Sequence, residues 1–295
     1  MVSHLQLKLI AAGLLVIALG WVWWAWHRTK RDLQTSEVHT VQGLVVQYIL
    51  TPERVNAIGE MRRTEFDVEP NGSVLIGNGE GLLEITTTAD GIHVDRITEK
   101  QPDSFCLDGQ GSLLSISQQY FGQLENSEFS QAVPLPYKNM RLGASSLAES
   151  TYLFGGDGGE GQRVYAFFGD GTLQIEAQIP ENVIAVSDNA SAVYIASQQA
   201  IYRVTSRRIE TVLRAPDGLD NIVSLAVSSD DKELFFATEK ETFFMSGLSA
   251  VAVLPDIGGT LRFRNRKLYV WSPVRQTLIA VSGVDDLVSR SKNGQ

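Results

Sequence analysis

Residues 224–245 read SLAVSSDDKELFFATEKETFFM. Three short apolar runs follow one another here, SLAV, ELFFA and TFFM, and their composition favours strands. The polar, Asp-rich segment between the first two runs and the Thr-Glu-Lys-Glu segment between the last two are typical of tight turns. This stretch therefore predicts three consecutive antiparallel strands.

The same arrangement recurs along the chain. Successive units are centred on apolar runs that begin at Val74, Leu113, Tyr152, Val193, Leu234 and Leu268, at spacings of 39, 39, 41, 41 and 34 residues. An apolar run precedes and another follows each of these, and five units have a fourth run. Repeated four-stranded units of about 40 residues are typical of a propeller, in which neighbouring blades cover each other's faces. We expect an all-β, six-bladed β-propeller; a β-sandwich or an open stack of hairpins is the alternative.

The two ends of the propeller domain are predicted to pair with each other. The sixth unit has no clear fourth strand, whereas the apolar stretch GLVVQYIL (43–50) precedes the first unit and has no partner. An unpaired strand edge leaves backbone N–H and C=O groups without partners and invites aggregation. We therefore expect residues 42–50 to pair near Gln276–Ser282. A short helical turn is expected within Pro52–Arg63.

An uncharged stretch, LIAAGLLVIALGWVWWAW, occupies residues 9–26. As a helix of 18 residues it would be about 27 Å long, close to the hydrocarbon thickness of a bilayer. One end carries four aromatic side chains that favour the membrane–water interface: Trp21, Trp23, Trp24 and Trp26. A single-pass transmembrane anchor is predicted. A cleaved signal peptide is the alternative, but the Trp-rich end has no convincing cleavage site.

The remaining organisation follows from this anchor. Residues 1–32 are assigned to the anchor and its basic flank, 33–40 to a polar stalk and 41–295 to the propeller. Arg28, Lys30 and Arg31 follow the apolar stretch, whereas only the amino terminus and Lys8 precede it. By the positive-inside rule this distribution mildly favours a cytoplasmic propeller, and a periplasmic or exterior one is almost equally compatible with it.

The chain has a net charge of −9, and the basic flank makes the propeller region more acidic still. Nucleic-acid binding requires clustered Lys and Arg, so we expect no nucleic-acid partner. The single cysteine, Cys106, excludes an internal disulfide and fits a buried apolar position. One histidine, His93, lies in the propeller region, which leaves few residues for a histidine-based metal site or a Ser-His-Asp triad.

The fourth and fifth units, residues 184–204 and 224–245, resemble the repeats of six-bladed propellers of the lactonase, senescence-marker and NHL type. The resemblance spans about residues 64–283, and its motif is common to many propellers. In the lactonase branch, an acidic residue and Asn or Asp side chains hold a divalent metal in the central tunnel. The resemblance implies Asn182, Asp220 and Asn221 as candidate ligands here, although no family-specific motif surrounds them.

Two further clusters stand out. The segment GGDGGEGQ (155–162) carries Asp157 and Glu160, whose carboxylates could hold Ca²⁺, but the spacing matches no known calcium loop and a plain hairpin loop is the alternative. Near the C-terminus, LRFRNRK forms a basic cluster. The cluster consists of Arg262, Arg264, Arg266 and Lys267. It is interpreted either as a binding patch for an anionic partner or as a solvent-exposed face.

These observations favour a non-enzymatic binding or scaffold module for a membrane-associated complex, with a protein partner and the lipid bilayer as its contacts. A propeller offers a wide, rigid surface with loops on two faces. The alternative is a metal-dependent lactonase-type hydrolase with its site in the tunnel, and a small-ligand sensor is a third reading. No cofactor is indicated beyond a divalent cation.

The anchor makes a direct prediction. Full-length protein should remain in the membrane fraction with residues 9–26 intact, whereas deletion of residues 1–32 should release a soluble, folded, β-rich protein. Membrane fractionation, N-terminal sequencing and circular dichroism measure these outcomes. A mature protein that begins after residue 26 would contradict the prediction.

Overall fold

We describe the fold from a computed structural model of the chain. The structure describes residues 38–41, 43–58, 65–125, 128–144, 151–156, 161–168, 171–189, 191–206, 208–228, 230, 232–246, 249–284 and 287. The predicted anchor, 9–26, lies outside these ranges. Among the described helices, none is long and apolar enough to cross a membrane.

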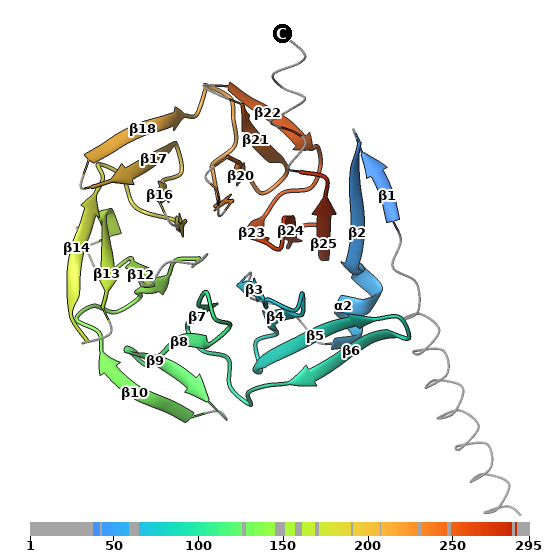
Figure 1. Cartoon of the computed structure of the whole chain (residues 1–295), viewed down its shortest axis with the longest axis horizontal. Coiled ribbons are helices and arrows are strands. Elements are labelled where there is room, and N and C mark those ends of the chain that lie inside the picture. The colour runs from blue at the N-terminus through green and yellow to red at the C-terminus, as the bar shows by residue number, and fades with distance from the viewer. Residues whose placement is uncertain are drawn as a thin grey trace, which may run out of the picture.

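Six antiparallel sheets surround a central axis, and each contributes its first strand to the inside of the ring (Figure 1). The expected six-bladed propeller is therefore confirmed. The first three blades comprise β3 (Phe66–Val68), β4 (Val74–Gly77), β5 (Leu82–Thr88) and β6 (Gly91–Arg96); β7 (Ser104–Leu107), β8 (Leu113–Ser117), β9 (Tyr120–Glu125) and β10 (Glu128–Pro134); and β11 (Arg141–Leu142), β12 (Thr151–Phe154), β13 (Arg163–Phe167) and β14 (Leu173–Gln178).

The other three blades follow the same order from the axis outwards, and the sixth takes its two outermost strands from the start of the domain. They comprise β15 (Ala185–Asp188), β16 (Val193–Ala196), β17 (Ala200–Thr205) and β18 (Arg208–Arg214); β19 (Ser224–Val227), β20 (Leu234–Ala237), β21 (Thr242–Ser246) and β22 (Ser249–Leu254); and β23 (Thr260–Arg264), β24 (Lys267–Ser272), β25 (Thr277–Ser282), β2 (Leu44–Leu50) and β1 (Val38–Val41).

Closure of the ring joins the two ends of the domain, as the sequence predicted. Strand β2 pairs antiparallel with β25, with Val45 opposite Ser282 and Leu50 opposite Leu278. Val46 is 2% exposed and belongs to the apolar cluster between the fifth and sixth blades, whereas Val45 is 42% exposed. The alternation of exposed Val45 and buried Val46 fixes how β2 pairs with β25, because a shift by one residue would expose Val46 and bury Val45.

A fifth strand, β1, extends the sixth blade beyond the predicted closure. It pairs with β2 from Val38 opposite Gln47 to Val41 opposite Leu44. Part of β1 falls within residues 33–40, the segment that the sequence analysis assigned to a stalk, so the paired structure of the domain starts earlier than residue 41. After β2 comes the short helix α2 (Pro52–Ile58), which lies within the range expected for a helical turn.

Apolar clusters fill the spaces between adjacent blades. One joins the fifth and sixth blades, and another joins the sixth blade to the first and includes the fully buried Trp271 and Val55 of α2. Burial of apolar area contributes about 25 cal/mol for each Å² removed from water. Since each blade depends on two neighbours for this burial, a break at any one seam exposes apolar surface on both sides of it.

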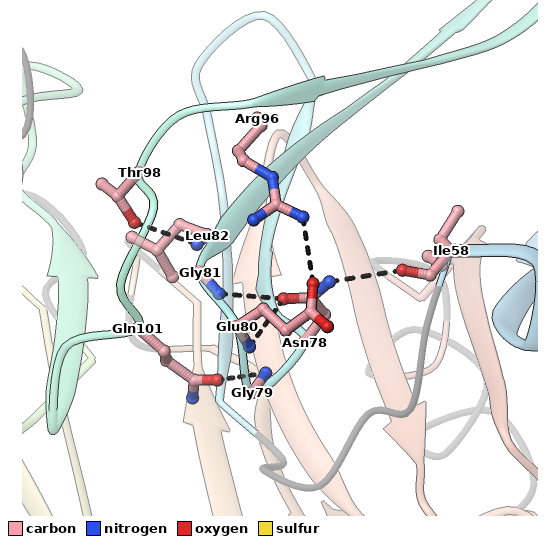
Figure 2. A network of polar contacts seen from close by, with 9 residues as sticks. All are labelled: Ile58, Asn78, Gly79, Glu80, Gly81, Leu82, Arg96, Thr98 and Gln101. Carbon is pink, nitrogen blue, oxygen red and sulfur yellow. Dashed lines mark hydrogen bonds and ion pairs between the residues drawn. The ribbon is translucent and has the colours of Figure 1, made fainter.

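The innermost strands all begin on one face of the ring, which we call the strand-start face. It carries the loops between blades and the turns that join the second strand of a blade to the third. In the first blade, Asn78 Oδ1 accepts bonds from the N–H groups of Glu80 and Gly81 at 3.1 and 3.0 Å (Figure 2). Ser197 and Thr238 accept equivalent turn bonds in the fourth and fifth blades.

The first blade shows how these turns are fixed to their surroundings (Figure 2). Asn78 Nδ2 donates to the carbonyl of Ile58 at the end of α2, at 3.3 Å. Gln101, in the loop that leads to the second blade, accepts a bond from Gly79 N at 2.6 Å. Thr98 in the same loop accepts a bond from Leu82 N at 3.0 Å. The end of α2 and the loop that leads to the second blade thus hold one turn, which gives this part of the strand-start face a defined shape.

Ring closure predicts a sharp difference between two truncations. Deleting residues 1–32 keeps β1 and β2 and should leave the thermal stability nearly unchanged. Deleting residues 1–50 removes the strand that covers β25 and should lower the melting temperature by more than about 10 °C or prevent folding. Differential scanning calorimetry of the two proteins provides the measurement.

Substitutions in β2 provide a matched control for the truncations. Val46→Asp places a charge in the apolar seam and should destabilise by more than about 3 kcal/mol. Val45→Asp adds the same charge at an exposed position and should cost less than about 1 kcal/mol. Equal stability of the two variants, or of the two truncations, would contradict closure through β2.

Candidate functional site

Two adjacent hollows open on the strand-start face, each with a volume of about 650 Å³. They share two lining residues, Asn139 and Arg141, at the start of the third blade. Arg141 is exposed, and its guanidinium makes no hydrogen bond or salt bridge with another described residue, although its charge acts on the nearby carboxyl group of Glu65. An exposed guanidinium between two polar hollows can bind a carboxylate or another planar anionic group through two parallel bonds.

The first hollow lies beside the second and third blades. Glu65 and Asp103 supply acidic side chains to its wall, and Lys138 and Arg141 supply basic ones. Hydrogen-bonding groups of Gln118, Gln119 and Tyr137 complete its polar lining. The two acids and two bases balance, so the hollow suits a ligand that is itself polar and carries both donors and acceptors.

A strained turn forms part of this wall. Gln118 and Gln119 join β8 to β9 and have φ angles of 51° and 70°. Two-residue hairpin turns with both φ angles positive strongly prefer Asn-Gly, because larger side chains disfavour this conformation. Asp103 Oδ2 accepts a bond from Gln118 N at 2.9 Å, and Gln119 Nε2 donates to Leu135 O at 2.7 Å. These bonds stabilise two glutamine residues in a backbone conformation that glycine would adopt more easily.

The second hollow brings together three residues that the resemblance implied as metal ligands. Asn182, Asp220 and Asn221 all line it, together with Lys240 and Glu239. Lys240 Nζ lies 2.7 Å from Asp220 Oδ2, and Asn221 Oδ1 accepts a bond from Gln199 Nε2 at 2.8 Å. The Asp220 carboxylate, the strongest candidate metal ligand, is thus paired with the Lys240 ammonium group. The side-chain oxygen of Asn221 already accepts a hydrogen bond.

This donor set does not fit a divalent cation. Ca²⁺ and Mg²⁺ sites use several oxygen ligands, with carboxylates supplying negative charge. In the second hollow, Lys240 and Arg141 offset the charges of Asp220 and Glu239. Across the described ranges, no three His, Cys, Asp or Glu side chains are grouped so that they could hold a metal ion. Asp157 and Glu160, the other predicted metal candidates, lie outside those ranges.

Deeper in the tunnel, Asp67 and Arg262 form a buried pair. Their side chains are 3% and 13% exposed, and Arg262 Nε lies 3.7 Å from Asp67 Oδ1. Asp67 also accepts bonds from the backbone N–H groups of Val68 and Leu107, both at 2.8 Å. The carboxylate is therefore committed to joining the first blade to the second and to neutralising an arginine of the sixth blade.

The predicted basic cluster is divided between two environments. Arg262 faces the tunnel, where its guanidinium lies 5.6 Å from the centre of the Phe66 ring. Arg264 is half-buried and donates to Val68 O at 3.1 Å, across the seam between the sixth and first blades. Arg266 is exposed at the hairpin turn, and Lys267 begins β24. A patch for an anionic partner would therefore consist mainly of Arg266 and Lys267.

Glu65 connects the tunnel to the first hollow. Burial raises the pKa of its carboxyl group, and the nearby positive charges of Arg141 and Arg262 partly oppose this shift. Glu65 Oε2 also accepts a bond from Phe105 N at 3.3 Å, which favours the charged form. The result is a partly buried acid, held between two arginines, at the floor of a polar hollow.

Sequence reasoning missed Glu65, Asn139 and Arg141. Glu65 lies immediately before the innermost strand β3, Arg141 is the first residue of β11, and Asn139 lies just before β11, with a φ angle of 60°. Nothing in their local sequence distinguishes them from solvated residues. The repeat itself was the available signal, because positions just before the first strand of each unit must meet at one face of a closed ring.

No protein-family model matches the chain, and no curated protein matches its sequence. Solved structures do match the fold. The gluconolactonase XC5397 from Xanthomonas campestris superposes with a TM-score of 0.55 and 12% identity, covering 82% of this chain and 91% of that one. For virginiamycin B lyase from Staphylococcus aureus the values are 0.53 and 10%, covering 85% and 95%.

A third match is the extracellular domain of the hybrid two-component system BT4673 from B. thetaiotaomicron, with a TM-score of 0.52 and 12% identity. The superposition covers 80% of this chain and 32% of that one. At such identities these similarities establish the fold and not the activity. The chain is thus a six-bladed β-propeller that resembles gluconolactonase and virginiamycin B lyase in architecture.

The raised pKa of Glu65 gives a pH-dependent prediction. Because the folded protein holds this proton more tightly than the unfolded chain, the folded state loses stability as pH rises through the window between the two pKa values. Glu65→Gln removes the titration and should gain melting temperature relative to the native protein as pH is raised from 4 to 8. The exposed Glu99→Gln, on the same face, should show no such trend in thermal melts. A gain for Glu65→Gln that is independent of pH would contradict this account.

Proposed function

We propose that this chain is a membrane-anchored binding module that presents the two hollows of its strand-start face to a partner in a membrane-associated complex, without catalytic chemistry of its own. The single observation that carries the proposal is the exposed Arg141, which lines both hollows and whose guanidinium makes no hydrogen bond or salt bridge with another described residue. The apolar stretch 9–26 supports the anchor.

The charge arrangement around Arg141 suits recognition. Both hollows are lined by acidic and basic side chains, which select partners by complementary charge and hydrogen bonding. The turn at Ser197 and the turn at Thr238 are braced by side-chain bonds, so a partner would meet a preorganised surface. Binding to such a surface costs less conformational entropy than binding to loops that must first be ordered.

The second candidate function is a metal-dependent hydrolase of the lactonase type. Similarity to gluconolactonase in fold favours it, and the shared location of Asn182, Asp220 and Asn221 matches what the resemblance implied. The ion pair between Lys240 and Asp220 argues against a hydrolase with a metal at this site, because the ammonium group already lies where a metal would bind the carboxylate. A propeller of this fold also forms the extracellular domain of a two-component system, so the fold alone does not distinguish a hydrolase from a binding module.

A pair of arginine substitutions tests the proposal. Arg141→Ala should abolish or reduce at least tenfold the recovery of specific partners when the full-length protein is purified in mild detergent, a loss of about 1.4 kcal/mol or more. Arg208→Ala removes an exposed arginine from the opposite face and should leave recovery unchanged. Quantitative mass spectrometry of the co-purified proteins measures both.

Two results would contradict the proposal. Equal recovery of the same partners by both variants would show that Arg141 takes no part in binding. Hydrolysis of lactones by the purified protein that depends on added divalent cations would favour the second candidate. Thermal melts of both variants control for folding, since an exposed arginine typically changes stability by less than about 0.5 kcal/mol.

A further inference from the structure

The first hollow contains an acid and a base that do not pair with each other. Glu65 and Arg141 both line it, and the charge of Arg141 acts on the Glu65 carboxyl group, yet no ion pair joins these two described residues. In the second hollow, by contrast, Lys240 Nζ lies 2.7 Å from Asp220 Oδ2, and the other acid there, Glu239, is exposed. The first hollow thus combines a partly buried acid with a base that is available to a ligand.

The carboxyl group of Glu65 is held from the side of the second blade. Phe105 N donates to Oε2 at 3.3 Å, and the side chain of Ser104 bonds the same group. Neither of these partners carries a charge. Arg262, the other arginine near Glu65, already forms the buried pair with Asp67. Among the described residues, the Glu65 carboxylate therefore has hydrogen-bond partners but no cation in contact with it.

The pKa of Glu65 is consistent with an uncompensated negative charge. Burial raises the pKa of this carboxyl group, although the positive charges of Arg141 and Arg262 act in the opposite direction. The charges of the protein therefore do not make up for the water that the carboxylate has lost. An opposite charge that comes close to a carboxylate favours its ionised form. An ammonium group of a ligand beside Glu65 would supply that charge.

Arg141 lies on another side of the same hollow. It is the first residue of β11 in the third blade, whereas Glu65 precedes β3 in the first, and the second blade with β7 lies between them in the ring (Figure 1). The exposed guanidinium presents a planar set of donors that matches a carboxylate through two parallel bonds. The fold thus holds a site for a carboxylate and a site for a cation at one hollow.

The rest of the lining suits a small molecule. The volume of about 650 Å³ lies within the range of about 300–1,000 Å³ that is typical of small-ligand pockets. Ile116, Leu135 and Met140 supply buried apolar side chains to the wall, against which the hydrocarbon part of a ligand can pack. Asp103 and Lys138, the other charged residues of the lining, are exposed, so water screens their charges more strongly than that of Glu65.

We propose that the first hollow binds a free α-amino acid, with its carboxylate on Arg141 and its ammonium group on Glu65. A ligand with a single charge would satisfy one of these two groups and leave the other without a partner. An uncharged polar ligand would form hydrogen bonds but would bring no charge to either group. The inference goes beyond the proposed function, because it concerns a small molecule and requires neither the membrane anchor nor a protein partner.

Calorimetric titration of the full-length protein in detergent micelles tests the proposal. The probes are the twenty common L-amino acids at neutral pH, and at least one should bind with a Kd below about 1 mM. The tightest binder is then compared with two analogues of the same carbon skeleton, one without the amino group and one without the carboxylate. Each analogue should bind at least about tenfold more weakly than the amino acid, because each loses one of the two charged contacts.

Two substitutions combined with these analogues assign each charge to its residue. Glu65→Gln should weaken binding of the amino acid about tenfold or more and should leave binding of the analogue without the amino group nearly unchanged. Arg141→Ala should weaken the amino acid by a similar factor and leave the analogue without the carboxylate nearly unchanged. Glu99→Gln and Arg208→Ala are the matched controls and should alter none of the three affinities. Thermal melts establish that each variant is folded.

Several results would overturn the inference. They are binding of no amino acid by the folded native protein, equal binding of the amino acid and its two analogues, and an equal effect of Glu65→Gln on all three ligands. Binding of a polyol such as glucitol, without binding of any amino acid, would overturn the choice of ligand. None of these results bears on the recovery of protein partners. If Arg141→Ala loses its partners while the native protein binds no amino acid, this inference fails and the proposed function stands.

Discussion

The pairing of β2 with β25 is the interaction on which the rest of the structure depends. Every other blade is built from a continuous segment of chain, whereas the sixth is complete only when residues from the start of the domain join it. Leu44, Val46 and Val281 then share one apolar cluster with the fifth blade. Because apolar clusters fill the seams between blades, the pairing of β2 with β25 buries the last open seam and closes the ring.

Polar side chains on the innermost strands complete the ring from the inside. Asp67 accepts the N–H of Leu107, Ser104 accepts that of Leu142, and Ser224 accepts that of Leu261. Each bond crosses from one blade to the next at the axis, where no sheet ladder continues. The carboxylate and hydroxyl oxygens of these strands are therefore already used as acceptors for bonds between blades. For this reason the buried Asp67 is not an obvious ligand for a metal or a substrate.

Sequence periodicity was sufficient for the architecture and insufficient for the site. Alternation and spacing predicted six units and closure by residues 43–50, because burial against neighbouring blades forces a regular pattern. β1 escaped notice because VHTV is short and joins only the outer edge of the sheet, where no burial pattern is required. Arg262 was interpreted as part of a surface cluster, yet it lies on an innermost strand where both faces are covered.

The site itself depends on contacts between units, which periodicity does not report. Asn182, Asp220 and Asn221 were candidates that the resemblance implied, and the structure does bring them together at one hollow. What the sequence could not show is that Lys240, from a turn of the next blade, would lie against Asp220, or that Arg141 would stand between two hollows. A contact between side chains of different segments, such as Lys240 with Asp220, determines whether an acidic side chain is available as a metal ligand or is part of an ion pair.

The two faces of the ring are unequal for a reason that begins with closure. Since β2 runs antiparallel to β25, it ends at the strand-start face, and the chain enters the first blade there through α2. The same face receives the loops between blades, and these supply Asn139, Asn182 and Asp220 to the hollows. One topological choice, closing the ring with N-terminal strands, therefore places α2 and the loops that line the hollows on the same side.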